Sequence, residues 1–213
     1  MMSKYLYRGV DISQFNGSVD FTALKKSGVD FVIIRLAGVN GGGIYKDKKC
    51  DVNYAGAMAS GLHVGFYYCG NDGDFNFKNY TYRVKKIKEW LSDYVFDMPF
   101  FYDVEGNILY KHNKKELTDH IKNFCFDIER AGYFVGIYMS MNPFNTCVYN
   151  HELDHFTRWV ARYSDKQPDL KGCKWDMWQK TDKHPLCGKK FDLDFCYKDY
   201  PTIIKNVLLN NYK

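Results

Sequence analysis

Short apolar runs recur along the chain and alternate with stretches whose apolar residues have helical spacing. Runs rich in β-branched and aromatic residues predict buried strands at 6–12, 31–36, 64–68, 98–104 and 134–139. The stretches between them predict helices at 21–27, 51–60, 80–94 and 114–131. Such strict alternation is typical of a parallel sheet with right-handed crossovers.

The last third of the chain has a different pattern, with strand-like runs at 158–163, 175–179 and 191–195 and little helix between them. A terminal helix is expected from Pro201. About eight strands in 213 residues predict an α/β fold, an irregular barrel of the triose-phosphate isomerase type. With 46% hydrophobic residues, the chain suits one compact domain spanning 1–213.

Two loops stand out between these elements. Residues 38–45 contain Gly38 and Gly41 to Gly43, with no following Lys-Ser/Thr pair, so a phosphate-binding loop is not expected. We predict a flexible loop over a site there. Residues 71–79 form a polar stretch and predict a second loop.

The fourth predicted strand ends in two acids, Asp103 and Glu105. Because side chains alternate along a strand, the two share one face, with Cβ atoms roughly 6.6 Å apart. Repulsion and partial burial are expected to raise one pKa and leave the other group ionised. Glycoside hydrolysis requires such a pair, one acid and one anion. The alternative is a strand end whose acids cap a loop or bind an arginine.

Other polar and aromatic residues fall at predicted strand ends, where barrels of this type carry their active sites. This set comprises Asp11, Tyr67, Tyr68, Asp103, Glu105, Tyr138, Gln179 and Asp192. Arg35 lies inside the second strand, so its charge is expected to meet a carboxylate or a cluster of carbonyls.

The net charge of +5 is mild, and it favours approach to acidic polymers such as bacterial walls. The basic residues are scattered and form no nucleic-acid-binding motif, so no nucleic-acid partner is expected. No run approaches the roughly 20 apolar residues of a membrane span. The N-terminus lacks the apolar segment of a secretion signal. We therefore expect a protein that acts inside the cell, is released by lysis or has lost its secretion signal.

Seven cysteines are present, none in a Cys-x-x-Cys pair. Buried free thiols are the simplest expectation, as for Cys69 and Cys125 within apolar runs. A bridge among Cys173, Cys187 and Cys196 stays open. No cysteine has an obvious histidine partner in the sequence, although pairing in space is also left open.

An ordered series of motifs resembles the glycoside hydrolase family 25 lysozymes, the Chalaropsis-type N-acetylmuramidases. The motifs are Gly-Val-Asp-Ile-Ser at 9–13, the segments 19–21, 28–35 and 61–67, Asp-Val-Glu at 103–105, Trp-Val-Ala-Arg-Tyr at 159–163, Trp-Gln at 178–179 and Asp-Leu-Asp at 192–194. The resemblance covers about 7–200. It departs from the family pattern at Tyr68, where many members carry His.

The resemblance implies a (β/α)5(β)3 barrel that cleaves the β-1,4 bond from N-acetylmuramic acid to N-acetylglucosamine in peptidoglycan outside the cell. Glu105 would be the general acid, and Asp103 would stabilise charge at the substrate's 2-acetamido group. Asp11 and Asp192 would complete an acidic floor. The candidate substrate-binding residues are Arg35, Tyr67, Tyr68, Tyr138, Trp159, Trp178 and Gln179. We expect a monomer with no cofactor and no metal ion.

Two alternative functions and the choice of mechanism stay open. Residues 151–155 match the His-Glu-x-x-His pattern of zinc peptidases, although a polar loop before the sixth strand is expected instead. A catalytically inactive glycan-binding barrel is the other alternative. The spacing of residues along a strand does not distinguish the carboxyl separation of an inverting glycosidase from that of a retaining one. We favour, as a hypothesis, a route in which the substrate's own acetamido oxygen is the nucleophile.

Overall fold

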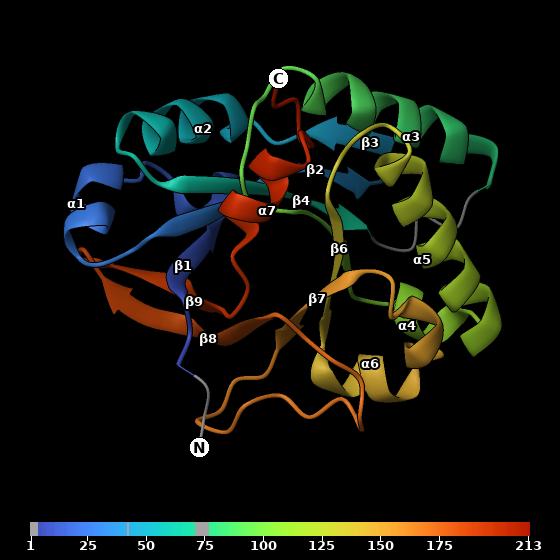
Figure 1. Ribbon diagram of the computed structural model, residues 1–213. Helices are drawn as coiled ribbons and strands as arrows, with labels where there is room; N and C mark the ends of the chain where they lie inside the picture. Colours follow the sequence, from blue (N-terminus) through green and yellow to red (C-terminus); the bar gives the residue numbers. More distant parts are fainter. Residues whose placement is uncertain (1–3, 42, 71–76) are drawn as a thin grey trace.

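The computed structural model describes residues 4–41, 43–70 and 77–213, and the side chains of residues 77 and 78 are not described (Figure 1). Most of the polar loop predicted at 71–79 therefore lies outside the described residues. So do Gly42 of the glycine-rich loop and the first three residues.

Eight strands close into a barrel, which confirms the predicted fold class. They are β1 (Tyr7–Ile12), β2 (Phe31–Asn40), β4 (His63–Gly70), β5 (Phe100–Val104), β6 (Val135–Ser140), β7 (Thr157–Ala161), β8 (Met177–Leu186) and β9 (Lys189–Cys196). From β1 to β8 neighbouring strands of the barrel pair parallel. The last strand, β9, pairs antiparallel with both β8 and β1 and so closes the barrel.

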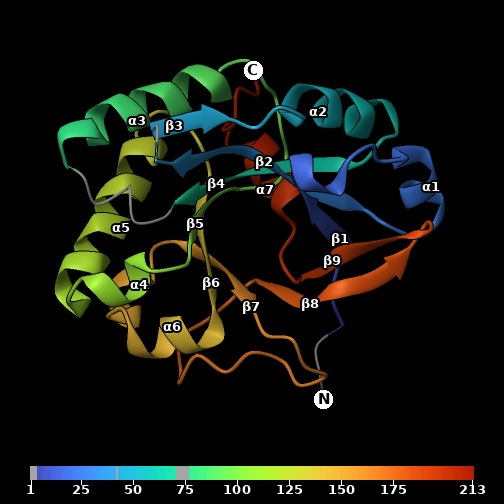
Figure 2. The ribbon, with the colours of Figure 1, turned by 180° about the vertical axis from the view of Figure 1, so that it is seen from behind.

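Helices follow the strands around the outside of the barrel (Figures 1 and 2). They are α1 (Phe21–Lys26), α2 (Cys50–Ala59), α3 (Phe77–Leu91), α4 (Ile108–Lys111), α5 (Lys114–Glu129), α6 (Met141–Thr146) and α7 (Tyr200–Asn206), with 3-10 turns η1 (Gln14–Asn16) and η3 (Asn150–Leu153). The long helices lie within a few residues of their predicted positions. Asp20 caps α1 as predicted, because its Oδ1 accepts from the Ala23 amide at 2.9 Å. The sequence pattern did not predict α4, α6 or η3, which are too short to show periodicity.

The glycine-rich segment is a hairpin rather than the flexible loop that we predicted. Strand β2 continues to Asn40 and pairs antiparallel with β3 (Gly43–Lys46), with Val39 opposite Ile44. The β-branched residues on both sides of the glycines supply this pairing. Among the described glycines, Gly38 lies within β2, Gly41 in the turn and Gly43 at the start of β3.

One end of the barrel is closed by α7, which lies across it in Figure 1. Tyr200 and Ile204 of this helix are fully buried and belong to the same apolar cluster as Phe31, Met98 and Phe101. This is the end where the parallel strands begin, because Cys196, just before α7, pairs with the first residue of β1. A ligand of the barrel interior is therefore expected to approach from the other end, where the strands finish.

The seven cysteines are all free, so the bridge considered among three of them is wrong. Cys173 faces His151, Cys187 lies exposed after β8 with its Sγ 3.3 Å from the Ser27 hydroxyl, and Cys196 is buried in β9. Each thiol thus sits in different surroundings.

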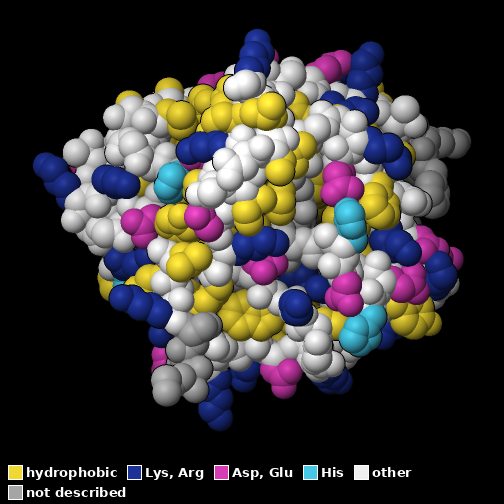
Figure 3. Space-filling model, viewed as in Figure 1, with side chains coloured by type: hydrophobic (Ala, Val, Ile, Leu, Met, Phe, Trp, Pro, Cys, Tyr) yellow, Lys and Arg dark blue, Asp and Glu magenta, His cyan; other side chains and the backbone are white. Residues whose placement is uncertain are grey.

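On the face in Figure 3, Lys and Arg side chains are interspersed with Asp and Glu. We see no continuous basic stripe on the described part of this face. No helix within 4–41, 43–70 and 77–213 is long and apolar enough to cross a bilayer.

Candidate active site

A cavity of about 160 Å³ opens among the barrel strands and their C-terminal ends. It is lined by Asp11, Tyr67, Asp103, Glu105, Tyr138, Trp159, Tyr163, Gln179 and Asp192. All but Tyr163 are candidates that the sequence placed at a site. The carboxylates and aromatic rings therefore converge where a barrel of this kind carries its chemistry.

Strand register explains why these side chains meet. Asp103 on β5 pairs with Cys69 on β4 and with Tyr138 on β6, so the three lie side by side. Tyr67 precedes Cys69 by two residues and shares its face. Glu105 follows β5 directly and extends the face of Asp103 to the rim, where it is exposed.

Two predicted site residues point the other way. Tyr68 is fully buried on the outer face of β4, where its ring stacks on Tyr102 at 5.8 Å between centroids. The indole Nε1 of Trp178 donates to the carbonyl of Arg162 at 2.8 Å, and its ring packs against Phe195. Each is adjacent in sequence to an inward residue, so alternation turns it away from the cavity, and we correct both candidates.

Arg35 is buried in β2 opposite Tyr67 of β4 and is not part of the cavity lining. Its Nε donates to Asp47 Oδ2 at 2.6 Å, which is the carboxylate partner that its burial required. Asp47 also accepts from the amides of Gln14 and Lys49 and is almost fully buried. Arg35 is therefore half of a buried ion pair, and its Nη2 has no hydrogen-bond partner among the described residues. Its role as a substrate contact stays a prediction.

The acids of the Asp-x-Glu motif share a site that disfavours charge. Burial and, secondly, repulsion from Glu105 raise the pKa of Asp103 well above its usual value. Burial of the carboxyl also raises the pKa of Glu105, although the residue as a whole is exposed. We expected one raised pKa and one ionised group. The structure raises both, because burial outweighs the lowering effect of Arg35 on Asp103 and of Cys69 on both carboxyls.

Asp103 has an unusual local environment. Only 4% of the residue is exposed, and its Oδ1 has no hydrogen-bond partner among the described residues. An unpaired buried acceptor is costly, about 1–3 kcal/mol. Such an atom beside an open cavity is suited to accept a hydrogen bond from a bound molecule.

Cys69 was missed as a site residue, because we expected a buried thiol in a strand. Its Sγ lies 3.8 Å from Glu105 Oε1, and its hydrogen bonding lowers the pKa of both Glu105 and Asp103. Burial raises the pKa of the thiol itself, which therefore keeps its proton and donates it. The signal was available, since Cys69 shares a strand face with Tyr67.

The opposite wall of the cavity is acidic. Asp11 on β1 pairs in register with Asp192 on β9. Burial, with repulsion from Asp194 and Asp192, raises the pKa of Asp11, and burial likewise raises those of Asp192 and Asp194. Asp194 was not predicted as a site residue, although its two-residue spacing from Asp192 places both on one face.

Hydrogen bonds hold this wall in place. Gln179 Nε2 donates to Asp11 Oδ2 at 2.7 Å, while its Oε1 accepts from Tyr138 at 2.8 Å and from Tyr163 at 3.0 Å. Below them, Trp159 Nε1 donates to Asp194 Oδ1 at 2.8 Å. The Gln179 amide thereby links an acid to two tyrosine hydroxyls.

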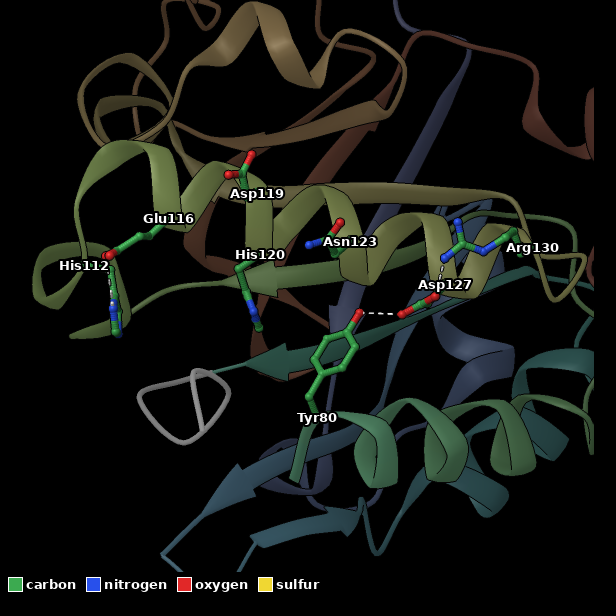
Figure 4. Close-up of a pocket in the computed structure, with 8 residues that line it drawn as sticks. All are labelled: Tyr80, His112, Glu116, Asp119, His120, Asn123, Asp127 and Arg130. Atoms are coloured by element: carbon green, nitrogen blue, oxygen red, sulfur yellow. Dashed lines mark hydrogen bonds and ion pairs between the residues drawn. The ribbon is translucent and has the colours of Figure 1, made fainter. Parts of the chain in front are cut away.

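A larger cavity of about 630 Å³ lies between α3 and α5, on the outside of the barrel (Figure 4). Its lining groups pair with one another: Tyr80 donates to Asp127 at 2.6 Å, and Arg130 pairs with the same carboxylate. His120 contacts Tyr102, which points outward from β5. Neither Asp103 nor Glu105 lines this cavity, so size alone does not make it the active site.

The His-Glu-x-x-His segment does not form a peptidase zinc site. Residues Asn150–Leu153 are a 3-10 turn, so the two histidines are not on one face of an α-helix. His155 Nε2 lies 2.9 Å from each Glu129 carboxylate oxygen, and Glu152 pairs with Lys122 at 3.0 Å. The residue that would act as base and the second ligand are thus engaged elsewhere, which overturns this alternative.

Comparisons with known proteins agree with the geometry. The profile of a family described as Glycosyl hydrolases family 25 matches residues 10–189. The "Autolytic lysozyme" of Clostridium acetobutylicum is 26% identical over 163 residues, 76% of this chain and 47% of that protein. "Lysozyme M1" of Streptomyces globisporus is 24% identical over 198 residues, 88% of this chain and 66% of that protein. This chain spans less than two thirds of the length of either relative.

Among solved structures, a bacterial lysozyme from Streptomyces coelicolor resembles this chain with a TM-score of 0.77. The two are 20% identical, and the match covers 100% of both chains. At that identity the likeness shows the fold.

Proposed function

The chain belongs to glycosyl hydrolase family 25, whose enzymes bind peptidoglycan and act on cell walls, and from this membership we propose that it is an active N-acetylmuramidase. The bond cleaved would be the β-1,4 linkage from N-acetylmuramic acid to N-acetylglucosamine in bacterial peptidoglycan. The observation that carries the proposal is the pair of Asp103 and Glu105 with raised pKa values in a cavity at the strand ends.

Glu105 has the properties of the general acid. It lies at the rim, where it can reach the leaving oxygen of a bound chain, and its raised pKa lets it hold its proton to a higher pH than an ordinary glutamate does. The Cys69 thiol opposes this rise and keeps the carboxyl able to release the proton. Asp103 lies deeper, where its unpaired Oδ1 could accept a hydrogen bond from the N–H of the 2-acetamido group.

These positions favour the substrate-assisted route. Glu105 would donate its proton to the glycosidic oxygen as the bond from that oxygen to C1 breaks, and the acetamido oxygen would bond to C1. Asp103 would stabilise the resulting positive oxazolinium ring through its N–H. Water, deprotonated by the Glu105 carboxylate, would then add to C1 and reopen the ring, restoring the acid. Isolation of a covalent glycosyl adduct on Asp103 would contradict this order of events.

The rest of the cavity suits a sugar ring. Tyr67, Tyr138, Tyr163 and Trp159 line it mainly with their polar edges, and the tyrosine hydroxyls can hydrogen-bond the hydroxyls of a bound sugar. The net charge of +5 favours approach to an acidic wall polymer. We propose that the protein works as a monomer on walls outside the cell, reached by secretion or lysis. The name of the autolytic relative is consistent with that setting.

The test is mass spectrometry of the products from purified peptidoglycan. New muramic acid reducing ends are expected with the wild type, and they should be absent with Glu105→Gln and Asp103→Asn. Glu152→Gln is the matched control, because it removes an exposed carboxylate that lies outside the cavity. New glucosamine reducing ends would overturn the bond specificity. Tight binding without cleavage by the wild type would instead indicate a glycan-binding barrel.

A further inference from the structure

Three side chains with metal-binding atoms meet on the surface near the start of β7 and β8. His151 belongs to η3, and Asp154 is the first residue after η3. Cys173 lies in the connection between β7 and β8. His151 Nδ1 lies 3.4 Å from Cys173 Sγ and 3.5 Å from Asp154 Oδ2. One ligand atom from each residue lies within 4.8 Å of the other two. We propose that His151, Asp154 and Cys173 bind a zinc ion.

The spacing of the atoms matches a zinc coordination sphere. Zinc binds nitrogen at about 2.05 Å, oxygen at about 2.1 Å and thiolate sulfur at about 2.3 Å, with tetrahedral angles. Two ligands on such an ion are therefore roughly 3.6 Å apart for nitrogen and sulfur, and roughly 3.4 Å apart for nitrogen and oxygen. The separations from His151 to Cys173 and to Asp154 differ from these values by only a few tenths of an ångström.

A buried arginine holds the two segments in this arrangement. Arg158 is 2% exposed, and its Nη2 donates to Asp154 Oδ1 at 2.7 Å and to the Asn150 carbonyl at 2.6 Å. Its Nη1 donates to the carbonyl of Lys174, next to Cys173, at 3.0 Å. The guanidinium thus occupies one carboxylate oxygen of Asp154 and leaves the other facing His151. Outer contacts of this kind orient the ligands of known metal sites.

The donor set determines which ion is expected. Nitrogen, sulfur and oxygen together suit Zn²⁺ and the chemically similar Co²⁺, whereas Mg²⁺ and Ca²⁺ prefer oxygen alone. The ion would displace the thiol proton of Cys173, so one proton is released to solvent for each ion bound. Three protein ligands leave the fourth position to water.

The site is remote from the carboxylate cavity and has a structural consequence. Asp154 and Cys173 lie shortly before the first residues of β7 and β8, whereas the cavity is at the opposite ends of the parallel strands. An ion here would clamp the β7–β8 connection onto η3. It would raise thermal stability and take no part in hydrolysis. This inference is independent of the proposed muramidase activity.

The test uses the whole reduced protein, stripped of metal and titrated with ZnCl₂. We expect one zinc per chain by elemental analysis, and a Tm higher by roughly 5–10 °C when free zinc exceeds its dissociation constant about 100-fold. His151→Ala and Cys173→Ser should each lose both effects. With Co²⁺, the wild type should show a thiolate-to-cobalt charge-transfer band that Cys173→Ser lacks.

Two variants serve as matched controls. His155→Ala removes the other histidine of the motif, which contacts Glu129, and Cys187→Ser removes an exposed thiol elsewhere. Both should bind zinc as the wild type does. No stoichiometric zinc in the wild type, or stoichiometric binding that survives both His151→Ala and Cys173→Ser, would overturn the proposal. Loss of binding in either control would also overturn it.

Discussion

Replacing Asp103 by asparagine should abolish turnover and at the same time stabilise the protein at neutral pH. Burial and repulsion from Glu105 raise the pKa of Asp103 in the folded state. A carboxyl whose pKa is raised on folding contributes stability at low pH, and this is lost as pH rises through the folded pKa. Ionisation of Asp103 as the pH rises therefore opposes folding. Asparagine has nearly the same shape and carries no charge.

The size of the gain follows from the spacing of the two acids. A carboxylate oxygen of Asp103 lies within 4.8 Å of one of Glu105, and two unit charges that close repel by about 3.5 kcal/mol at an effective dielectric constant near 20. Because Glu105 is exposed at the rim, solvent screening reduces this to about 1 kcal/mol. For a chain of 213 residues, that gain corresponds to a Tm increase of roughly 2–4 °C.

The measurement is urea unfolding of wild type and Asp103→Asn at pH 7 and pH 3, beside reducing-end release from peptidoglycan. The gain should vanish at pH 3, where both carboxyls are protonated. Asp47→Asn is the opposite control, because this buried carboxylate pairs with Arg35 and its loss should destabilise by about 3–5 kcal/mol. A lower stability of Asp103→Asn at pH 7, or a gain that persists at pH 3, would refute the reasoning.

Three more predictions concern the site and its supports. Cys69→Ala removes a donor that lowers the pKa of Glu105, so the high-pH limb of the pH–rate profile should shift to higher pH. An unchanged profile would exclude an effect of Cys69 on the pKa of Glu105. Burial lowers the pKa of His120 to about 4, so stability should fall by about 3 kcal/mol from pH 6.5 to 4, and urea unfolding of His120→Gln should show a flatter dependence. Gln179→Leu leaves Asp11 without its amide donor and should destabilise by at least about 2 kcal/mol in calorimetry, with higher KM; an unchanged Tm would count against the network.

Much of the barrel could be predicted from local pattern, because a strand buried on both faces reads as a nearly continuous apolar run. Phe31–Leu36 and Phe100–Val104 are of this kind, and both are strands in the structure. The same pattern hides which face of a strand points inward. Tyr68 and Trp178 were therefore assigned to a site that their neighbours Tyr67 and Gln179 line.

Contacts between distant segments were beyond local pattern. The burial of Arg35 predicted a carboxylate or carbonyl partner for its charge. That this partner is Asp47 depends on the β2–β3 hairpin, which the glycine-rich sequence did not predict. His151 was considered with His155, whereas the structure turns it toward Cys173 on another connection.

The sequence by itself determined the order of strands and helices, the class of fold and the strand end that carries the paired acids. These follow from the periodicity of side chains along one segment, a property of nearest neighbours in the chain. Only the tertiary structure decided that Cys69 donates to Glu105, that Asp194 joins the acidic wall and that both acids of the motif resist ionisation. The physical reason is that register, burial and charge arise from strands brought together by closure of the barrel.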